Sequence, residues 1–473
     1  MTSDNSSKAL KAGAWYTLSN ILIRSVSVIT APIFTRLLTP ADYGLFNNFF
    51  SWQNILACVF GLCLNYSIGR AKIDFKNDFN GFISSIQTLS ALTGLALLII
   101  ALPFIGPLSA FMEIDKGLLI SLLVMLIFSP SISYLQSKFR FEYRYKENVL
   151  IAIINTVGTV AVSVVLILLS DTDSRYVGRI LGSVLPIFLI GIFAFIYLYA
   201  KGKTGVNIQY WKYALRISLP MIPHGLAMVL LAQIDRIMLL KMADETAAGL
   251  YSFGYSYALI ISVFTNAIMN AWQPWLYDNV SEGNYFEIKR SNKMLNTLGV
   301  VLMSVFIIMG PEVIMILGTP AFYEAKWMVA PVVCGCFFQF IYSYFSLMEI
   351  YCKRTELIAI GSIGAAALKI ILNLYAIPRF GYVGAAYTTM ISYAVLMVYH
   401  WLMFRMIYKE PIYHQRQLAV FCVVAVIFTL LIVTVYDNII VRYIVLFAIV
   451  GVSGLIYRKR LVGLARQYVL KQK

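Results

Sequence analysis

The stretch WYTLSNILIRSVSVITAPIFTRLL, residues 15–38, decides the fold that the sequence predicts. It is about two dozen mostly apolar residues, and a membrane-spanning helix needs ~20 residues at ~1.5 Å each. One charged residue, Arg24, lies near its middle. Four residues recur at steps of three and four and so share one helix face: Thr17, Asn20, Arg24 and Ser27. We therefore expect a transmembrane helix with one polar face.

Arg24 has two interpretations. An arginine at membrane depth is costly and nearly always faces a protein interior or a water-filled cavity. Arg24 either binds a ligand in such a cavity or pairs with a carboxylate on another helix. Its neighbours are amides and hydroxyls, and acids are scarce in the apolar segments, so the sequence favours the cavity.

The composition of the whole chain is that of a polytopic membrane protein. Of 473 residues, 60% are hydrophobic and only 13% are charged, with a mean hydropathy of +0.78. The net charge of +16 does not indicate nucleic acid, because the basic residues lie in short loops between apolar spans, where topology rules explain them. The six cysteines form no CxxC pair, so we expect no metal site and no disulfide framework.

An apolar window finds about fourteen spans joined by short connections. The longest connection expected is 277–293. The spans are 14–38, 43–68, 81–102, 117–137, 148–170, 177–200, 213–240, 247–276, 294–316, 328–350, 357–377, 383–407, 418–436 and 440–457.

The distribution of lysine and arginine predicts the orientation. With the N-terminus in the cytoplasm, about 25 of the 38 basic residues fall on the inner side and about 6 on the outer side. This asymmetry predicts that both termini are cytoplasmic. Of the basic residues within spans, Arg36, Arg179, Arg216 and Arg405 lie near span ends and are expected to snorkel to the headgroups.

The two halves of the chain resemble each other at a shift of about 206 residues. Tyr176-Val177-Gly178 matches Tyr382-Val383-Gly384, and Gly44-Leu45-Phe46 matches Gly249-Leu250-Tyr251. Six spans separate the members of each pair, which keeps the orientation and predicts a parallel repeat about an axis along the membrane normal. We expect lobes at 1–205 and 206–410, with 411–473 as an added helix pair and a basic cytoplasmic tail.

Polar stripes follow this repeat. One face of span two carries Asn47, Asn54 and Asn65, and one face of span eight carries Asn266 and Asn270. Such faces either pack as interhelical contacts or line water. The number of amides on each stripe indicates that some of them face a hydrated route.

Span seven combines helix breakers with charge. Pro220 and Pro223 predict a kink or hinge. Asp235 is one of three acids within spans; Glu312 and Glu349 lie near span ends and are expected at the interface. Asp235 is either a structural ion partner of Arg236 or an ion-coupling site.

Two segments carry a resemblance to a known family: TRLLTPADYGLFNNFFSW (residues 35–52) and NLYAIPRFGYVGAAYTTMIS (residues 373–392). They resemble the polysaccharide-transporter branch of the MOP flippase superfamily. This branch includes the O-antigen flippases of the Wzx type and, further off, lipid II flippases and multidrug MATE exporters. The resemblance implies two six-helix bundles that alternate access to a cationic central cavity, in the cytoplasmic (inner) membrane of a bacterium. In lipid II flippases a deep arginine of the first span contributes to the cavity, and Arg24 matches it in kind.

The resemblance implies transport of an undecaprenyl-pyrophosphate-linked oligosaccharide, an O-antigen or capsular repeat unit. On that basis the cations would hold the pyrophosphate and the amides the sugar hydroxyls. The expected partners are this substrate, membrane lipids, and a polysaccharide polymerase with its chain-length machinery. The residues assigned to substrate binding are Arg24, Asn20, Asn47, Asn54, Asn65, Arg236, Asn266, Asn270 and Lys369.

Other classes fit less well. A MATE-like cation-coupled exporter needs a deep carboxylate, and deep basic groups outnumber deep acids here. A membrane-embedded glycan ligase or polymerase usually carries a large outer loop, which the predicted topology lacks. Nucleotide loops, HExxH and a nucleophile elbow are absent from the sequence, so we expect no cofactor and no enzyme activity.

Overall fold

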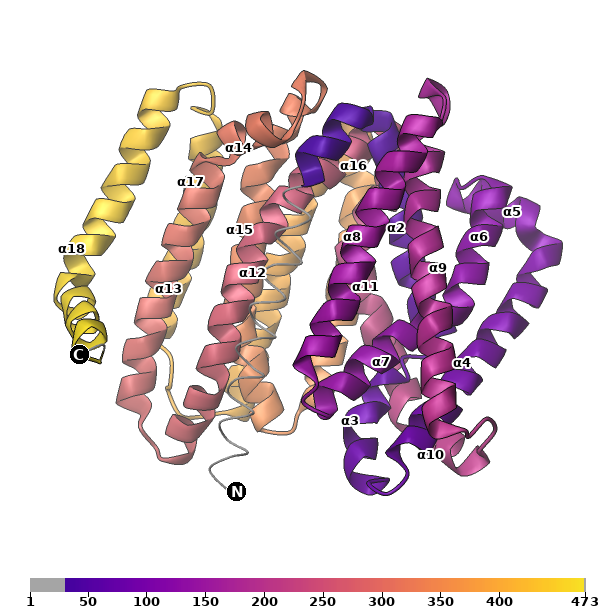
Figure 1. Cartoon of the computed structure of the whole chain (residues 1–473). Helices are drawn as coiled ribbons and strands as arrows, with labels where there is room; N and C mark the ends of the chain where they lie inside the picture. The colour runs from indigo at the N-terminus through magenta and orange to yellow at the C-terminus, as the bar shows by residue number, and fades with distance from the viewer. Residues whose placement is uncertain (1–29, 472–473) are drawn as a thin grey trace. The chain divides into compact units, whose positions relative to one another are not determined.

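The computed structural model describes the backbone of residues 30–471 and the side chains of residues 30–455 (Figure 1). Every regular element in this range is a helix, and eleven helical segments are long and apolar enough to cross a membrane. A helix satisfies its backbone N–H and C=O groups by internal hydrogen bonds, and these groups have no water to bond to in the hydrocarbon core of a membrane. The prediction of an all-helical polytopic protein is confirmed. Of the first predicted span, only the helical residues 30–37 and Leu38 belong to the described part.

The chain divides into two compact units. The first consists of Met1–Phe253, Leu317–Phe322 and Ala359–Ala385, and the second of Gly254–Ile316, Tyr323–Ile358 and Ala386–Lys473. The elements up to the unit boundary are α2 (Pro40–Phe60), α3 (Asn65–Asp74), α4 (Phe79–Ala101), η1 (Leu102–Phe104), α5 (Ile105–Met112), α6 (Lys116–Phe128), α7 (Pro130–Phe141), α8 (Tyr145–Leu169), η2 (Thr172–Ser174), α9 (Arg175–Gly202), α10 (Ile208–Ser218), η3 (Leu219–Met221), α11 (Ile222–Met242) and α12 (Glu245–Ser281). The remaining elements are α13 (Tyr285–Ile308), α14 (Gly310–Leu317), η4 (Pro320–Ala325), α15 (Lys326–Tyr351), α16 (Thr355–Ile407), α17 (Gln415–Val433) and α18 (Ile439–Lys471). Helices α12 and α16 each contribute to both units.

Two prolines interrupt the predicted span 213–240, as the sequence predicts. The span 213–240 breaks into α10, the 3₁₀ turn η3, and α11, with Pro220 in η3 and Pro223 at the start of α11. A proline lacks the N–H that would continue the ladder and clashes with the preceding turn. The kink predicted for this span is therefore confirmed.

Two further breaks involve positive φ. Helix α2 gives way to α3 at Leu62 and Cys63, whose φ angles are 47° and 50°, and no proline in the sequence marks this break. In α16, Gly381 has a φ of 55° and a ψ of −141°, a conformation that glycine adopts without steric cost. Gly381 separates the two predicted spans 357–377 and 383–407.

The expected long connection at 277–293 is wrong. Helix α12 continues to Ser281 and α13 begins at Tyr285, so residues 282–284 alone join them. A span predicted from hydropathy ends where polar residues begin. The helix itself can continue beyond that point, because water outside the hydrocarbon solvates polar side chains.

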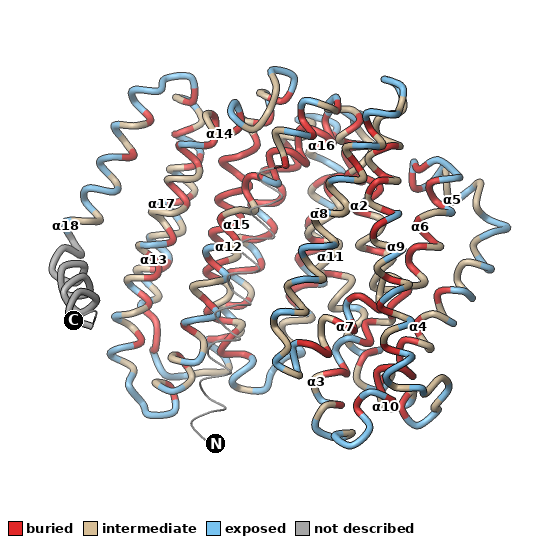
Figure 2. The backbone as a smooth tube through the Cα atoms, in the orientation of Figure 1, coloured by how far each residue is buried: buried red, intermediate tan, exposed pale blue. Residues whose placement is uncertain are grey.

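In the first unit, α9 packs against α4, α6, α7 and α8, and α2 packs along α11. In the second unit, α15 is central (Figure 2). In the most apolar stretch of Pro320–Tyr351, which contains α15, 83% of the residues are buried, against 22% in that of α17. Helix α17 packs against α13 and α15, and α18 packs against α13.

The added helix pair α17–α18 is held to α13 and α14 by polar contacts. The Tyr436 hydroxyl donates to the Ile307 carbonyl at 3.1 Å, and Arg442 donates to the Ile308 carbonyl and pairs with Glu312. Glu312 therefore has an ion partner that the sequence analysis did not identify. The pair of helices thus packs on the second unit through these contacts.

The matched glycines Gly44 and Gly249 meet where α2 crosses the start of α12. A Cβ on Gly44 would collide with the Glu245 carbonyl oxygen, and a Cβ on Gly249 would collide with that of Pro40. Residues 40 and 245 are related by the same shift of 205 that relates the two glycines. The contact is therefore reciprocal, as across a two-fold axis.

Replacing Gly249 by alanine should destabilise the protein. The added methyl meets backbone atoms rather than a flexible side chain, and overpacking of this kind costs roughly 1–3 kcal/mol. We expect Gly249→Ala to lower the Tm of the purified protein in detergent. Gly364→Ala is the matched control, since a Cβ there meets nothing within 4 Å. A Gly249→Ala protein that melts at or above the wild-type temperature would contradict the close crossing.

Candidate functional site

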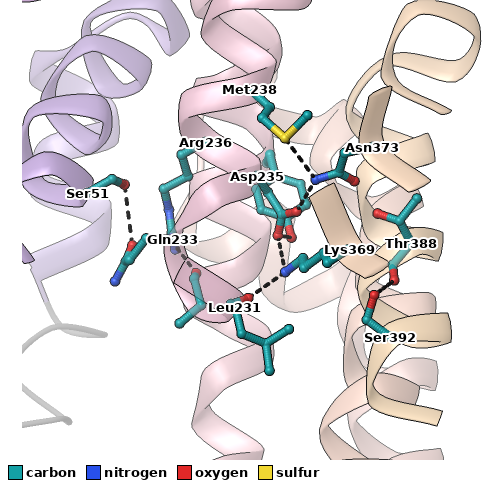
Figure 3. A network of polar contacts seen from close by, with 12 residues as sticks. Ser51, Leu231, Gln233, Asp235, Arg236, Met238, Lys369, Asn373, Thr388 and Ser392 are labelled. Atoms are coloured by element: carbon teal, nitrogen blue, oxygen red, sulfur yellow. Dashed lines mark hydrogen bonds and ion pairs between the residues drawn. The ribbon is translucent and has the colours of Figure 1, made fainter. Parts of the chain in front are cut away.

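A buried ion pair lies at the centre of the polar contacts of the first unit (Figure 3). Asp235 comes from α11 and Lys369 from the first part of α16, and the Lys369 Nζ lies 2.6 Å from an Asp235 carboxylate oxygen. Both side chains are 0% exposed. Removing two charges from water costs several kcal/mol per ion unless each is paired and hydrogen-bonded. The remaining contacts of these two groups therefore matter.

Among the described residues, those contacts come from three helices. The Tyr251 hydroxyl of α12 donates to Asp235 Oδ2, and Asn373 Nδ2 of α16 donates to Oδ1 at 2.8 Å. Lys369 also donates to the Leu231 carbonyl at 2.7 Å. Lys369 and Asn373 are four residues apart and so face the same way on α16. The cluster joins α11, the start of α12 and the first part of α16 through charged and polar groups in a water-poor interior.

Arg236 takes a different direction from its neighbour Asp235. Its Nη1 donates to Gln233 Oε1 at 2.6 Å and to the Ala232 carbonyl at 3.0 Å, and the Ser51 hydroxyl of α2 also donates to Gln233 Oε1. Asp235 was interpreted either as a structural ion partner of Arg236 or as an ion-coupling site. The structure shows a structural ion pair, but the partner of Asp235 is Lys369 and not Arg236. Adjacent residues on a helix do not face each other, which is why the chain neighbour is not the partner.

The amide residues assigned to substrate binding fall into two groups. Asn47 is buried and donates to the Tyr43 carbonyl at 2.7 Å; Asn54 is half-buried and donates to the Phe50 carbonyl at 2.7 Å. These two bond to their own helix.

The other amides, Asn65, Asn266 and Asn270, are exposed. Within the described part of the chain, none of these three side chains has a hydrogen-bond partner. They are the amides that remain open to water or to a ligand. Asn20 and Arg24 lie outside the described residues.

Arg179 was expected to snorkel at the outer face, and the structure shows a different environment. Its guanidinium lies 3.9 Å from the ring centre of Phe34 and 4.2 Å from that of Phe46. It also donates to the hydroxyls of Ser163 and Ser183, at 2.6 and 3.1 Å. Arg179 is thus held by aromatic faces and hydroxyls between helices, an arrangement that depends on tertiary packing.

A second buried pair, which was not predicted from the sequence, lies in the second unit. Glu349 was expected at the interface but is 1% exposed, and both of its carboxylate oxygens lie within 2.9 Å of His400 Nδ1. His400 itself is 0% exposed. The signal available in the sequence was a lone histidine within the predicted span 383–407, which the count of deep charges did not include.

No group of three or more histidine, cysteine, aspartate or glutamate side chains is close enough to hold a metal ion among the residues that the structure describes. The chemistry that the described cluster offers is that of neutralised charge and amide hydrogen bonding.

Breaking the Asp235–Lys369 pair from one side should be strongly destabilising. Asp235→Asn leaves an uncompensated buried ammonium, and Lys369→Met leaves an uncompensated carboxylate; each costs roughly 3–5 kcal/mol. We expect the double variant Asp235→Asn/Lys369→Met to melt well above either single variant. Thermal unfolding in detergent measures this, and Asp74→Asn, at the exposed pair with Arg70, is the control expected to change little. Additive losses in the double variant would show that the two groups are not energetically coupled.

Comparisons with known proteins agree with this architecture. A profile of the family described as "Polysaccharide biosynthesis protein" matches residues 9–280. A stretch of 110 residues is 31% identical to "Lsg locus putative protein 1" of Haemophilus influenzae and spans 22% of this chain and 27% of that relative.

Among the solved structures that are similar to this one are three membrane transport proteins. The lipid II flippase MurJ in an inward closed conformation matches with a TM-score of 0.73 at 16% identity, covering 96% of this chain and 100% of that one. An inward-facing multidrug MATE transporter of the MOP superfamily matches with a TM-score of 0.65 at 16% identity, covering 81% and 94%. A MOP transporter from Pyrococcus furiosus, whose title describes a binding pocket of reverse polarity, matches with a TM-score of 0.54 at 17% identity, covering 84% and 95%.

These likenesses show that the chain has the same fold as these three proteins. Because the profile covers more than half of the sequence, the chain belongs to the polysaccharide biosynthesis protein family.

Proposed function

We propose that this protein moves an undecaprenyl-pyrophosphate-linked oligosaccharide, an O-antigen or capsular repeat unit, from the inner to the outer leaflet of the bacterial cytoplasmic membrane. The family and the flippase fold support lipid-linked transport in general, and the glycan and its carrier are the proposed part. A pyrophosphate and a sugar chain cannot cross ~30 Å of hydrocarbon unaided.

The observation that carries the proposal is the state of Asp235. A cation exporter needs a deep carboxylate that is available to a cation. Asp235 is instead neutralised by Lys369 and hydrogen-bonded by Tyr251 and Asn373, fully buried in the first unit. A flippase for an anionic head group has no need of a free carboxylate. The buried pair therefore favours the flippase over the exporter.

The substrate would be held by two kinds of group. Arg24, Arg236 and Lys369 are proposed for the pyrophosphate, because charge-assisted hydrogen bonds to phosphate oxygens are the strong ones. Lys369 could act in this way only by exchanging Asp235 for the phosphate, so its proposed role requires a rearrangement of the pair. The exposed amides Asn65, Asn266 and Asn270 are proposed for sugar hydroxyls.

The proposed route is alternating access, with the lipid tail left in the bilayer and both chain termini in the cytoplasm. Asp235 is kept as the proposed ion-coupling residue, because it is the acidic partner of Lys369. The lobes 1–205 and 206–410 are proposed as the moving parts, with 411–473 as an added helix pair outside them. A polysaccharide polymerase and its chain-length machinery are the proposed partners on the outer side.

The alternative is a MATE-like cation-coupled multidrug exporter, whose fold is also similar to this one. The two functions predict different phenotypes in a strain that lacks the gene. Loss of a flippase should remove a surface glycan and cause its lipid-linked precursor to accumulate. Loss of an exporter should raise drug susceptibility and leave the glycan intact.

The function can be tested by complementing the deletion strain with variants. We expect Arg24→Ala to abolish surface glycan while the protein still reaches the membrane, because the pyrophosphate would lose a charged partner at membrane depth. Arg36→Ala is the matched control: Arg36 is exposed and its guanidinium donates to the Pro32 carbonyl of its own helix. Glycan immunoblots and membrane-fraction blots give the two readouts.

Full complementation by Arg24→Ala at normal membrane levels would count against the cationic binding site. Drug sensitivity of the deletion strain with unchanged glycan would select the exporter instead.

A further inference from the structure

A basic pocket of about 890 Å³ lies in the second unit, where helices end. Its cations come from three places: Lys289 near the start of α13, Arg405 in the last turn of α16, and Lys409 and Arg416 on either side of the α16–α17 connection. Arg405, Lys409 and Arg416 are exposed. Within the described part of the chain none of these four cations forms an ion pair, and the neighbouring Glu410 does not line the pocket.

The first turn of α17 adds to the same positive field. The helix begins at Gln415, and its N-cap residue His414 makes no capping hydrogen bond through its side chain. The N–H groups at a helix start favour an anion, and His414 and Gln415 both line the pocket. The pocket thus presents flexible cations together with one helix start.

An apolar groove of about 210 Å³ adjoins this pocket and shares Gln415 with it. Its walls come from the second part of α16 and from α17, including Val398, Trp401, Leu418 and Val423. Val398 precedes Arg405 by seven residues, which is roughly 10 Å along a helix. The groove therefore runs from the basic end of α16 toward its apolar middle.

The exposed face around the groove is hydrocarbon-like. Val398, Leu402, Val420 and Val423 are 42%, 45%, 56% and 58% exposed. Trp401 stands at the transition, with the Arg405 guanidinium 5.3 Å from its ring centre. Tryptophan and arginine at the end of an apolar span are typical of the headgroup level of a bilayer. The basic pocket would lie at that level and the groove within the acyl region.

We propose that the pocket and groove together bind one anionic glycerophospholipid, with its phosphate held by Arg405, Lys409, Arg416 and Lys289 and one acyl chain along the groove. Basic pockets between transmembrane helices at a membrane surface bind anionic lipid head groups. The site belongs to the second unit, whereas the Asp235 cluster belongs to the first. Bound lipid would join the end of α16 to α13 and α17 and stabilise the second unit.

The charge and the groove together select this occupant. A free phosphate would satisfy the cations but leave the groove empty, and a zwitterionic lipid would fill the groove but add a positive charge beside four others. An anionic phospholipid satisfies both features. Such lipids are also abundant in the membrane, so a site of low affinity would still be occupied because the lipid concentration is high.

The test measures lipid binding by the purified full-length protein in a neutral detergent. Native mass spectrometry counts bound lipid, and thermal unfolding reports stabilisation, with phosphatidylglycerol, phosphatidylcholine and inorganic phosphate as separate probes. We expect one retained phosphatidylglycerol and a saturable rise in Tm with phosphatidylglycerol only. The triple variant Arg405→Gln/Lys409→Gln/Arg416→Gln should lose both responses.

Two further variants make the result specific. Arg140→Gln/Lys201→Gln/Lys212→Gln removes three exposed charges elsewhere and should behave as wild type. Ala419→Trp, at an exposed wall of the groove, keeps every cation and should lower phosphatidylglycerol binding several-fold.

Equal stabilisation by inorganic phosphate, or unchanged phosphatidylglycerol binding in the pocket triple variant, would overturn the proposal. Loss of binding in the control triple variant would also overturn it, because general surface charge would then be the cause. These readouts do not involve glycan export, so this proposal and the proposed function can fail independently.

Discussion

The shared burial of Asp235 and Lys369 is the interaction on which the first unit depends. Either charge alone would be very costly in a region without water, so each makes the other tolerable. The Tyr251 hydroxyl and the Asn373 amide also donate to the carboxylate, and the Leu231 carbonyl accepts from the ammonium. The result is a buried polar junction between α11, α12 and α16. The same junction removes a carboxylate from the chemistry available to a ligand, which bears on the choice between anionic and cationic substrates.

Much of the architecture follows from the sequence because it depends on local rules. Apolar length predicts the spans, and Pro220 and Pro223 predict the break between α10 and α11, since a missing N–H acts on the residue that carries it. The matched triplets that begin at Gly44 and Gly249 predict a relation between the halves, and the structure brings these two glycines together. The helical extension of α12 to Ser281 was not predicted, because hydropathy reports the apolar part of a helix and not its ends.

The polar partners could not be predicted in the same way, because they are chosen by packing. Asp235 lies beside Arg236 in the chain, but its ion partner is Lys369, 134 residues away. Glu349 pairs with His400, and Glu312 pairs with Arg442. In both pairs the partner comes from a different helix, and the sequence gives no reason to expect the two helices to be neighbours. Arg179 looks from its position like an interfacial anchor, yet two phenylalanine rings and two hydroxyls surround it. Residue type and depth identify such groups as important, whereas only the fold identifies what they touch.

The crossing of α2 and α12 at Gly44 and Gly249 has a mechanical consequence. Backbone meets backbone there, with no side chain between the two helices to compress or to change rotamer. Sliding one helix along the other is opposed by hard peptide groups on both sides, but a small tilt about the crossing point disturbs few contacts. The crossing therefore resembles a pivot of fixed position, and any swinging of these helices would have it as a stationary point.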